Sequence, residues 1–321
     1  MNKKWITFIG AVLLSAALLA SCSASGAAKQ TVKLATGGNT GTYYAFGTAV
    51  GQILGEKSGV SFNIQSTGAS KANIQLISAK EVNMAIVQND VMDYAFNGTD
   101  LFATDGAVKG FSAMAGLYAE VVQIVVDPEA GIKTIADLKG KSVSVGDAGS
   151  GVEFNAKQIL EAYGVTFEDI KKQNLSFAAS ADAFKDDKID AFFCTAGAPT
   201  TAIMDLVTTK PIQILGVEAD KAAALKAAHP FYTTYEIPAG TYSGVDAAVT
   251  TLAVKATFIV SDELDQDTVY KLTKALFDNQ DAIAKAHAKG KELSTAYAVE
   301  GISIKFHPGA EKYYKEVGAL K

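Results

Sequence analysis

Arginine is absent from this chain of 321 residues, and all 29 of its basic residues are lysine. A guanidinium group is the side chain that holds a carboxylate through two parallel hydrogen bonds. A carboxylate bound by this protein must therefore be held by helix N-termini, hydroxyls, amides or a lysine ammonium.

Cysteine and histidine are scarce as well. Only Cys22 and Cys194 are present, and Cys194 lies in an apolar run that is typical of a buried small hydrophobic residue. The three histidines, His229, His287 and His307, are far apart in the sequence. Their spacing matches no metal-ligand pattern, so we expect no metal site and no cofactor.

Catalytic motifs are also missing. Ser150 is preceded two positions earlier by Ala148, which excludes a G-x-S-x-G nucleophile motif. No other nucleophile and base stand in a recognised arrangement, so the sequence predicts a binding protein rather than an enzyme. The net charge of −5 makes nucleic acid an improbable partner.

The first 21 residues are predicted to be a signal peptide. Lys3 and Lys4 precede an apolar stretch over residues 6–19, which is too short to span a membrane comfortably. The following Leu-Ala-Ser-Cys at 19–22 resembles the lipobox of bacterial lipoproteins, which implies cleavage before Cys22 and acylation of that residue. An ordinary secretory signal with an incidental cysteine is the alternative.

Small and polar residues follow Cys22 and predict a tether over residues 22–30. The mature protein is expected outside the cytoplasm, with a lipid anchor in the bilayer. It would lie on the outer face of the cytoplasmic membrane or in the periplasm.

Strand and helix patterns alternate through the remaining residues. This rhythm predicts an α/β fold with two lobes, each a mostly parallel sheet flanked by helices. Two β-branched runs, at 121–126 and 249–260, are candidates for strands that connect the lobes. They predict a first lobe of residues 31–118 plus 255–321, a second lobe of residues 122–248, and a hinge near 119–126 and 249–260.

A loop of small and hydroxyl residues at 36–46 follows the first predicted strand and opens a helix. Bare backbone N–H groups at such a turn form an anion site. Three further loops, at 66–70, 146–151 and 195–199, have the same character and follow predicted strands. Open α/β sheets bind ligands at this edge, so the four loops predict one cleft.

Individual side chains suggest how a solute would be held. The carboxylate of an amino acid would meet N–H groups at Gly37–Thr42 and Gly149–Gly151, and Glu120 would meet its ammonium. Tyr43 would supply an apolar wall with a hydroxyl tip. The predicted ligand-binding residues are Thr36, Gly37, Gly38, Thr40, Gly41, Thr42, Tyr43, Thr67, Gly68, Ser70, Asn73, Gln88, Asp90, Glu120, Gly149, Ser150, Gly151 and Thr195.

Several of these residues have structural alternatives. Ser70, Ser150 and Asp90 could cap helices instead of binding the solute. Glu120 could be a surface carboxylate at the hinge, and Tyr43 could pack in the core at the start of its helix.

The chain also resembles the TAXI family, the solute receptors of tripartite ATP-independent periplasmic (TRAP) transporters. The resemblance covers essentially the whole mature chain and is carried by 33–54, 66–73, 84–90, 117–120, 137–141 and 149–151. It implies a type II periplasmic-binding-protein fold that closes on a solute and delivers it to an ion-driven TRAP permease. Family members bind glutamate, glutamine or small dicarboxylates, and many lack a lipid anchor.

Two other functions remain open at this stage. One is an ABC-type receptor of the same fold, for example for sulfonates or thiamine precursors. The other is a lipid-anchored sensor that presents its closed form to a signalling partner.

Overall fold

The computed structural model describes residues 30–321. The predicted signal peptide and Cys22 lie outside these described residues. Within residues 30–321, no helix combines the length and the hydrophobicity needed to cross a membrane.

All strands belong to one curled sheet with the order β2-β1-β3-β10-β4-β7-β5-β6, in which β8 also pairs with β4 and β9 with β10. The strands β1, β2 and β3 are parallel, as are β5, β6 and β7. The strand bounds are β1 (Thr31–Ala35), β2 (Ser61–Gln65), β3 (Met84–Gln88), β4 (Phe111–Val126), β5 (Ser142–Ser144), β6 (Lys171–Gln173), β7 (Ala191–Ala196), β8 (Gln213–Leu215), β9 (Thr233–Ile237) and β10 (Val249–Ser261).

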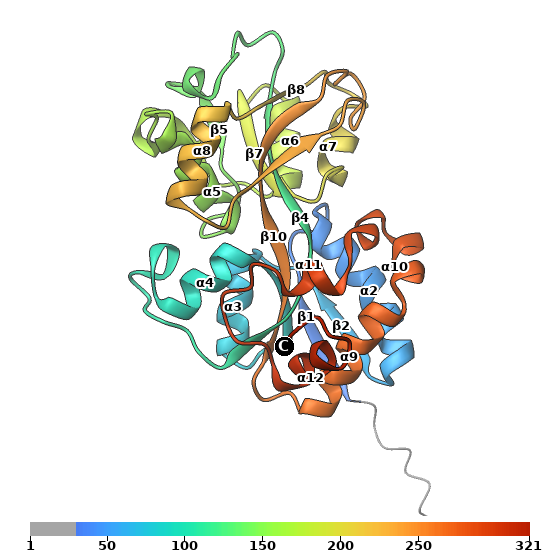
Figure 1. Ribbon diagram of the computed structural model, residues 1–321. Helices are drawn as coiled ribbons and strands as arrows, with labels where there is room; N and C mark the ends of the chain where they lie inside the picture. Colours follow the sequence, from blue (N-terminus) through green and yellow to red (C-terminus); the bar gives the residue numbers. More distant parts are fainter. Residues whose placement is uncertain (1–29) are drawn as a thin grey trace, which may run out of the picture. The chain divides into compact units, whose positions relative to one another are not determined.

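Helices flank the sheet and produce two lobes (Figure 1). The lower lobe holds α2 (Thr42–Ser58), α3 (Ser70–Ser78), α4 (Asn89–Asn97), η1 (Asp100–Phe102), α9 (Gln266–Asp278), α10 (Gln280–Ala286), η4 (Ala288–Glu292), α11 (Thr295–Val299) and α12 (Pro308–Glu316). The upper lobe holds η2 (Ile135–Leu138), α5 (Gly151–Ala162), η3 (Phe167–Asp169), α6 (Phe177–Lys185), α7 (Thr201–Leu206) and α8 (Ala219–Ala228).

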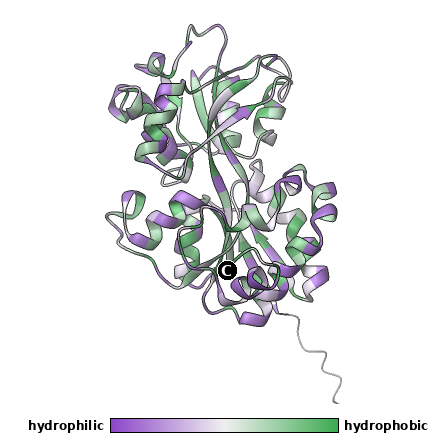
Figure 2. Cartoon of the chain, in the orientation of Figure 1, coloured by the Kyte–Doolittle hydropathy of each residue, from purple (hydrophilic) through white to green (hydrophobic). Residues whose placement is uncertain are grey.

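The hydrophobic pattern explains these elements. In α2, Phe46, Val50 and Leu54 recur at helical spacing and are fully buried, and Gly59 ends the helix with a left-handed φ of 78°. Each buried side chain of this size contributes about 1.5–3 kcal/mol. Hydrophobic residues gather along the central strands, and hydrophilic residues gather on the outer helix faces (Figure 2).

The antiparallel strands β4 and β10 run through both lobes (Figure 1). The strand β4 has 16 residues and begins at Phe111, ten residues before the predicted β-branched run. Its first half is rich in alanine and also contains glycine and serine, which carry little strand signal in the sequence. Burial on both faces makes this segment a strand despite its composition.

Candidate functional site

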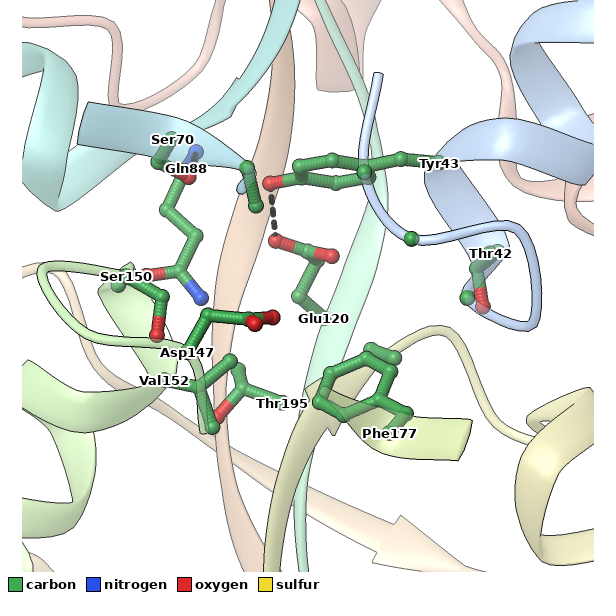
Figure 3. Close-up of a pocket in the computed structure, with 16 residues that line it drawn as sticks. Thr42, Tyr43, Ser70, Gln88, Glu120, Asp147, Ser150, Val152, Phe177 and Thr195 are labelled. Atoms are coloured by element: carbon green, nitrogen blue, oxygen red, sulfur yellow. Dashed lines mark hydrogen bonds between the residues drawn. The ribbon is translucent and has the colours of Figure 1, made fainter. Parts of the chain in front are cut away.

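A small cleft lies between the lobes, where the loops after β1, β2 and β5 meet the ends of β3 and β7 (Figure 3). Its cavity volume is about 40 Å³. One water molecule needs about 10–15 Å³ on this measure, so this conformation leaves room only for a small solute. The cleft is lined by Gly37, Gly38, Gly41, Thr42, Tyr43, Ala69, Ser70, Gln88, Glu120, Asp147, Ser150, Gly151, Val152, Phe177, Thr195 and Ala196.

Three helices begin at the cleft. The N-caps of α2 and α3 are Gly41 and Ala69, and neither provides a side-chain capping bond. The first N–H groups of these helices therefore receive no side-chain cap, and the helix dipole adds a partial positive charge. At α5 the Ser150 hydroxyl caps the helix by accepting a hydrogen bond from Glu153 N at 3.1 Å.

Glu120 is the most deeply buried carboxyl group in the cleft, with 2% of its surface exposed. The Tyr43 hydroxyl donates a hydrogen bond to Glu120 Oε2 at 2.6 Å. Burial raises the pKa of Glu120 to about 8, while the Tyr43 bond and the more distant Lys289 charge oppose this rise. Glu120 is therefore held largely protonated at neutral pH in this unliganded cleft.

Asp147 is the second carboxyl group, and it points into the same space (Figure 3). Burial raises its pKa above the usual range. Among the described residues that line the cleft there is no lysine or histidine. The described lining of the cleft therefore combines two carboxyl groups with helix N-termini and lacks a basic side chain.

Two buried polar atoms at the cleft have no hydrogen-bond partner within residues 30–321. They are Gln88 Oε1 and Thr195 Oγ1, on side chains that are 2% and 4% exposed. A buried polar atom without a partner costs about 1–3 kcal/mol, so such atoms mark places where a ligand can bind. Gln88 reaches from β3 toward the Ser150 loop of the opposite lobe (Figure 3).

The lobes approach each other through glycine backbone. A Cβ on Gly151 would overlap the Gln88 side-chain amide, and a Cβ on Gly197 would lie 2.8 Å from Thr42 Cγ2. Thr42 Oγ1 also donates to Gly197 O across the cleft at 3.0 Å. Glycine at positions 151 and 197 permits this close contact between the lobes.

The structure brings most of the predicted residues together. Both lobes contribute to the set that lines the cleft, which is Gly37, Gly38, Gly41, Thr42, Tyr43, Ser70, Gln88, Glu120, Ser150, Gly151 and Thr195. Ser150 both caps α5 and lines the cleft, whereas Ser70 does not cap α3 but accepts a hydrogen bond from Gln88 N. Glu120 is buried rather than on the surface.

Other predicted residues lie outside the cleft lining, and these are Thr36, Thr40, Thr67, Gly68, Asn73, Asp90 and Gly149. Their hydrogen bonds hold the fold: Asn73 Nδ2 donates to Thr36 O and Ile86 O, and Thr67 Oγ1 donates to Thr36 O. Gly149 N donates to the Glu153 carboxylate.

Asp90 is not the N-cap of α4 either. That position belongs to Gln88, which makes no side-chain capping bond. The Asp90 carboxylate accepts from Val91 N at 2.8 Å and from Asn155 Nδ2 at 3.1 Å.

The sequence interpretation missed Ala69, Asp147, Val152, Phe177 and Ala196, which also line the cleft. Asp147 lies within the glycine-rich loop that the sequence had singled out, so an acidic residue there was a usable signal. Phe177 is the first residue of α6, and nothing in its local sequence marks it as a cleft residue.

No group of histidine, cysteine, aspartate or glutamate suited to a metal ion occurs within residues 30–321. The described part of the cleft is lined by hydroxyl, amide and carboxyl groups together with apolar side chains such as those of Val152 and Phe177. The site is suited to holding a small polar molecule.

Solved structures of low sequence identity have the same fold. A protein of Bordetella bronchiseptica RB50 is 17% identical, with a TM-score of 0.56, over 91% of this chain and 90% of that chain. PhnD1 of Prochlorococcus marinus MIT 9301, solved with methylphosphonate, is 10% identical, with a TM-score of 0.56, over 91% and 99%. A Listeria monocytogenes protein described as an L-cystine ABC transporter is 16% identical, with a TM-score of 0.52, over 83% and 98%.

These likenesses confirm the predicted two-lobed fold of periplasmic binding proteins. The family model identifies the chain more closely: it belongs to the NMT1-like family, whose model matches residues 34–318. This is a family of periplasmic solute-binding proteins of ABC-type transporters, and its members are binding proteins rather than enzymes. The chain is accordingly an extracytoplasmic solute-binding protein.

Proposed function

We propose that this chain binds a small amino-acid zwitterion between its lobes, without chemical turnover, and delivers it to a membrane permease. The observation that carries the proposal is the composition of the cleft. Helix N-termini supply donors for an anion, and Glu120 and Asp147 supply acceptors for a cation. An α-amino acid carries both charges within a few bonds.

The carboxylate of the solute would meet backbone N–H groups at the start of α2 and α5. A helix N-terminus stabilises an anion by about 0.3–1 kcal/mol, and by up to about 2 kcal/mol where it is partly buried. Two such termini, together with the Ser150 hydroxyl, would replace the arginine that this chain lacks.

The ammonium group would meet Glu120. Gln88 Oε1 and Thr195 Oγ1 lack other partners among the described residues and lie in the same cleft. These three oxygens are as many acceptors as an ammonium group has N–H donors. The ammonium would also place a positive charge beside Glu120, where the described lining of the unliganded cleft provides none.

The same composition disfavours a dicarboxylate. Its second carboxylate would face Glu120 and Asp147 with no lysine or histidine among the described lining residues. Burying like charges together costs several kcal/mol unless a proton is taken up. We therefore favour amino acids with an uncharged side chain, such as glutamine, over dicarboxylates.

Calorimetric titration with L-glutamine, L-glutamate and succinate tests this ligand class. We expect an amino acid to bind and to be recovered unchanged, and succinate to bind weakly or not at all. Tighter binding of succinate than of any amino acid would contradict the proposal, as would a chemical change in the recovered solute.

Binding would occur by closure of the lobes about the strands that join them. The moving bodies would be residues 31–118 plus 255–321 and residues 122–248, with hinges near 119–126 and 249–260. Small-angle X-ray scattering should show a more compact particle when the amino acid is added. An identical scattering profile with and without bound solute would exclude closure.

The permease can be of two kinds. The resemblance to TAXI receptors favours a TRAP permease driven by an ion gradient, and membership of the NMT1-like family favours an ABC permease driven by ATP. Uptake by vesicles that contain the partner permease, with either a sodium or proton gradient or internal ATP, distinguishes the two.

A lipid anchor at Cys22 would keep the receptor at the membrane. Mass spectrometry of the mature N-terminus should find diacylglycerol and fatty acid on this residue. An unmodified mature N-terminus would instead support an ordinary secretory signal.

A further inference from the structure

A second group of buried polar side chains joins the lobes beside the cleft. Asp90 and Tyr94 come from α4 in the lower lobe, and Asn155 and Gln158 come from α5 in the upper lobe. Tyr232 precedes β9 in the upper lobe. All five are at most 6% exposed, and we call them the α4–α5 bridge.

Hydrogen bonds connect the members of the bridge across the lobes. Asn155 Nδ2 donates to Asp90 Oδ2 at 3.1 Å, and Gln158 Nε2 donates to the Tyr94 hydroxyl at 3.3 Å. Within the upper lobe, Asn155 Nδ2 also donates to the Tyr232 hydroxyl, which donates to Gln158 Oε1 at 2.8 Å. Tyr232 thus fixes the two amides that reach across to α4.

Aromatic rings surround these polar contacts. The Tyr94 ring meets Phe154 edge to face with centroids 5.3 Å apart, and it meets Phe231 at 6.0 Å. Rings in this arrangement exclude water from the polar groups that they cover, which strengthens the hydrogen bonds inside.

The bridge is separate from the cleft. None of its five described residues lines the cleft in which the solute is proposed to bind. Its two cross-lobe bonds need α4 and α5 to be as close as they are here, so the bonds break when the lobes separate. In an open form, water would hydrate Asp90 and Asn155 instead.

Resting on the proposed closure of the lobes on a solute, we propose that the α4–α5 bridge sets the affinity for the solute without touching it. The bridge stabilises the closed form, and only that form surrounds the solute. The apparent Kd equals the Kd of the closed form divided by the fraction of protein that is closed. A loss of bridge bonds therefore weakens binding by lowering that fraction.

Asn155→Ala is the main test, because it removes the bond of this residue to Asp90 across the lobes and its bond to Tyr232 within the upper lobe. Alanine favours a helix more than asparagine does, so α5 should remain intact. We expect a smaller closed fraction in the unliganded protein, seen by small-angle X-ray scattering. We also expect a roughly tenfold higher Kd for L-glutamine, since a hydrogen bond to a charged group contributes about this factor.

A matched pair of tyrosines provides the control. Tyr94→Phe removes a hydroxyl that bonds across the lobes and keeps the ring against Phe154. Tyr314→Phe removes another buried hydroxyl, which donates to Met114 O at 2.9 Å within the lower lobe. We expect Tyr94→Phe to raise the Kd severalfold and Tyr314→Phe to lower only the Tm.

The outcomes separate this inference from the proposed function. If Asn155→Ala and Tyr94→Phe lower the Tm as Tyr314→Phe does, without changing the scattering profile or the Kd, the bridge is only structural and the inference is wrong. If the parent binds no L-glutamine but Asn155→Ala still opens it, the proposed ligand is wrong and the bridge stands. A parent that is fully open without solute and binds no L-glutamine overturns both.

Discussion

Glu120 and Asp90 are both almost fully buried carboxyl groups, and they belong to two different groups of polar side chains. Glu120 lines the cleft, and within residues 30–321 the Tyr43 hydroxyl is the one donor of a hydrogen bond to its carboxyl group. Asp90 belongs to the α4–α5 bridge and accepts from Val91 N and Asn155 Nδ2. Burial raises both pKa values, to about 8 for Glu120 and to about 6 for Asp90.

The two pKa values differ because the two carboxyl groups receive different numbers of hydrogen bonds from the protein. Hydrogen bonds to a carboxylate favour its charged form, and Asp90 has more of them from the protein itself. Glu120 keeps acceptor capacity free, and the neighbouring Gln88 Oε1 lacks a partner among the described residues. The cleft is thus a network that a ligand can complete, and the bridge is a network that the opposite lobe completes.

Glu120→Gln should have the largest effect on binding. The amide keeps an oxygen for the Tyr43 hydroxyl but carries no charge for the ammonium of the solute. A hydrogen bond between charged groups contributes about 1.5–3 kcal/mol, so we expect the Kd of an amino acid to rise roughly 10- to 100-fold by calorimetry. A deaminated analogue of the same length should bind the parent and the variant almost equally; equal losses for both compounds would refute the assigned role.

Gly151→Ala should weaken binding roughly tenfold. Its Cβ would overlap the Gln88 side-chain amide, so either Gln88 leaves the cleft or the lobes stop short of contact. The backbone at this first position of α5 tolerates alanine, so the Tm should stay near that of the parent. The control is Gly68→Ala, whose Cβ would meet only ordinary contact with Ala72 at 3.6 Å. A Kd unchanged by Gly151→Ala would show that the lobes do not meet here during binding.

Much of the cleft could be predicted from the sequence because its loops follow a local rule. Small residues between a strand and a helix mark the ligand-binding edge of an α/β sheet, and this rule located Gly41, Ser150 and Thr195. The same rule included Thr67 and Asn73, which lie outside the cleft lining and bond to the carbonyl of Thr36. A short polar side chain at a loop has the same sequence signature whether it binds a solute or a backbone carbonyl.

The α4–α5 bridge could not be predicted from the sequence. Asp90 and Asn155 are 65 residues apart, and Asn155 and Tyr232 are 77 apart. Nothing local marks Asn155, which lies in the middle of a helix with a regular apolar pattern. Only the curl of the sheet, which brings α4 against α5, places these side chains together.

The pH dependence of affinity should depend on Glu120. Its pKa of about 8 falls when an ammonium group binds beside it, so binding below pH 8 releases a proton. The Kd should therefore decrease as the pH rises from 6 to 8, by at most about tenfold per pH unit. Burial raises the pKa values of the neighbouring Tyr43 and Tyr118, so their hydroxyls stay neutral in this range, whereas Asp90, with a pKa of about 6, loses its remaining proton in the lower part of it. Calorimetry in buffers of different ionisation enthalpy would detect the proton, and Glu120→Gln should abolish both the slope and the release.

The smallest expected effect is on the stability of the unliganded protein, and it arises from Asp90. The folded state holds a proton on Asp90 more tightly than the unfolded state does, because burial raises the pKa from 3.8 to about 6. The stability contributed by this group is therefore complete below pH 4 and is lost as the pH rises to 6. The nearby Asp100 carboxyl supports the raised pKa, and the Tyr94 and Tyr232 hydroxyls beside it stay neutral in this window.

Asp90→Asn should remove this slope without breaking the bridge, since Asn155 Oδ1 has no partner among the described residues and could accept from the new amide. Thermal unfolding at pH 4, 5 and 6 should show a decline of the Tm in the parent that is about 2–4 °C smaller in the variant. Glu120→Gln should also reduce the decline above pH 4.5, because burial raises the pKa of Glu120 from 4.5 to about 8, and it should flatten the further decline between pH 7 and 8. If Asp90→Asn also flattened the decline between pH 7 and 8, the two carboxyl groups would titrate as one site, and the separation between cleft and bridge would not hold.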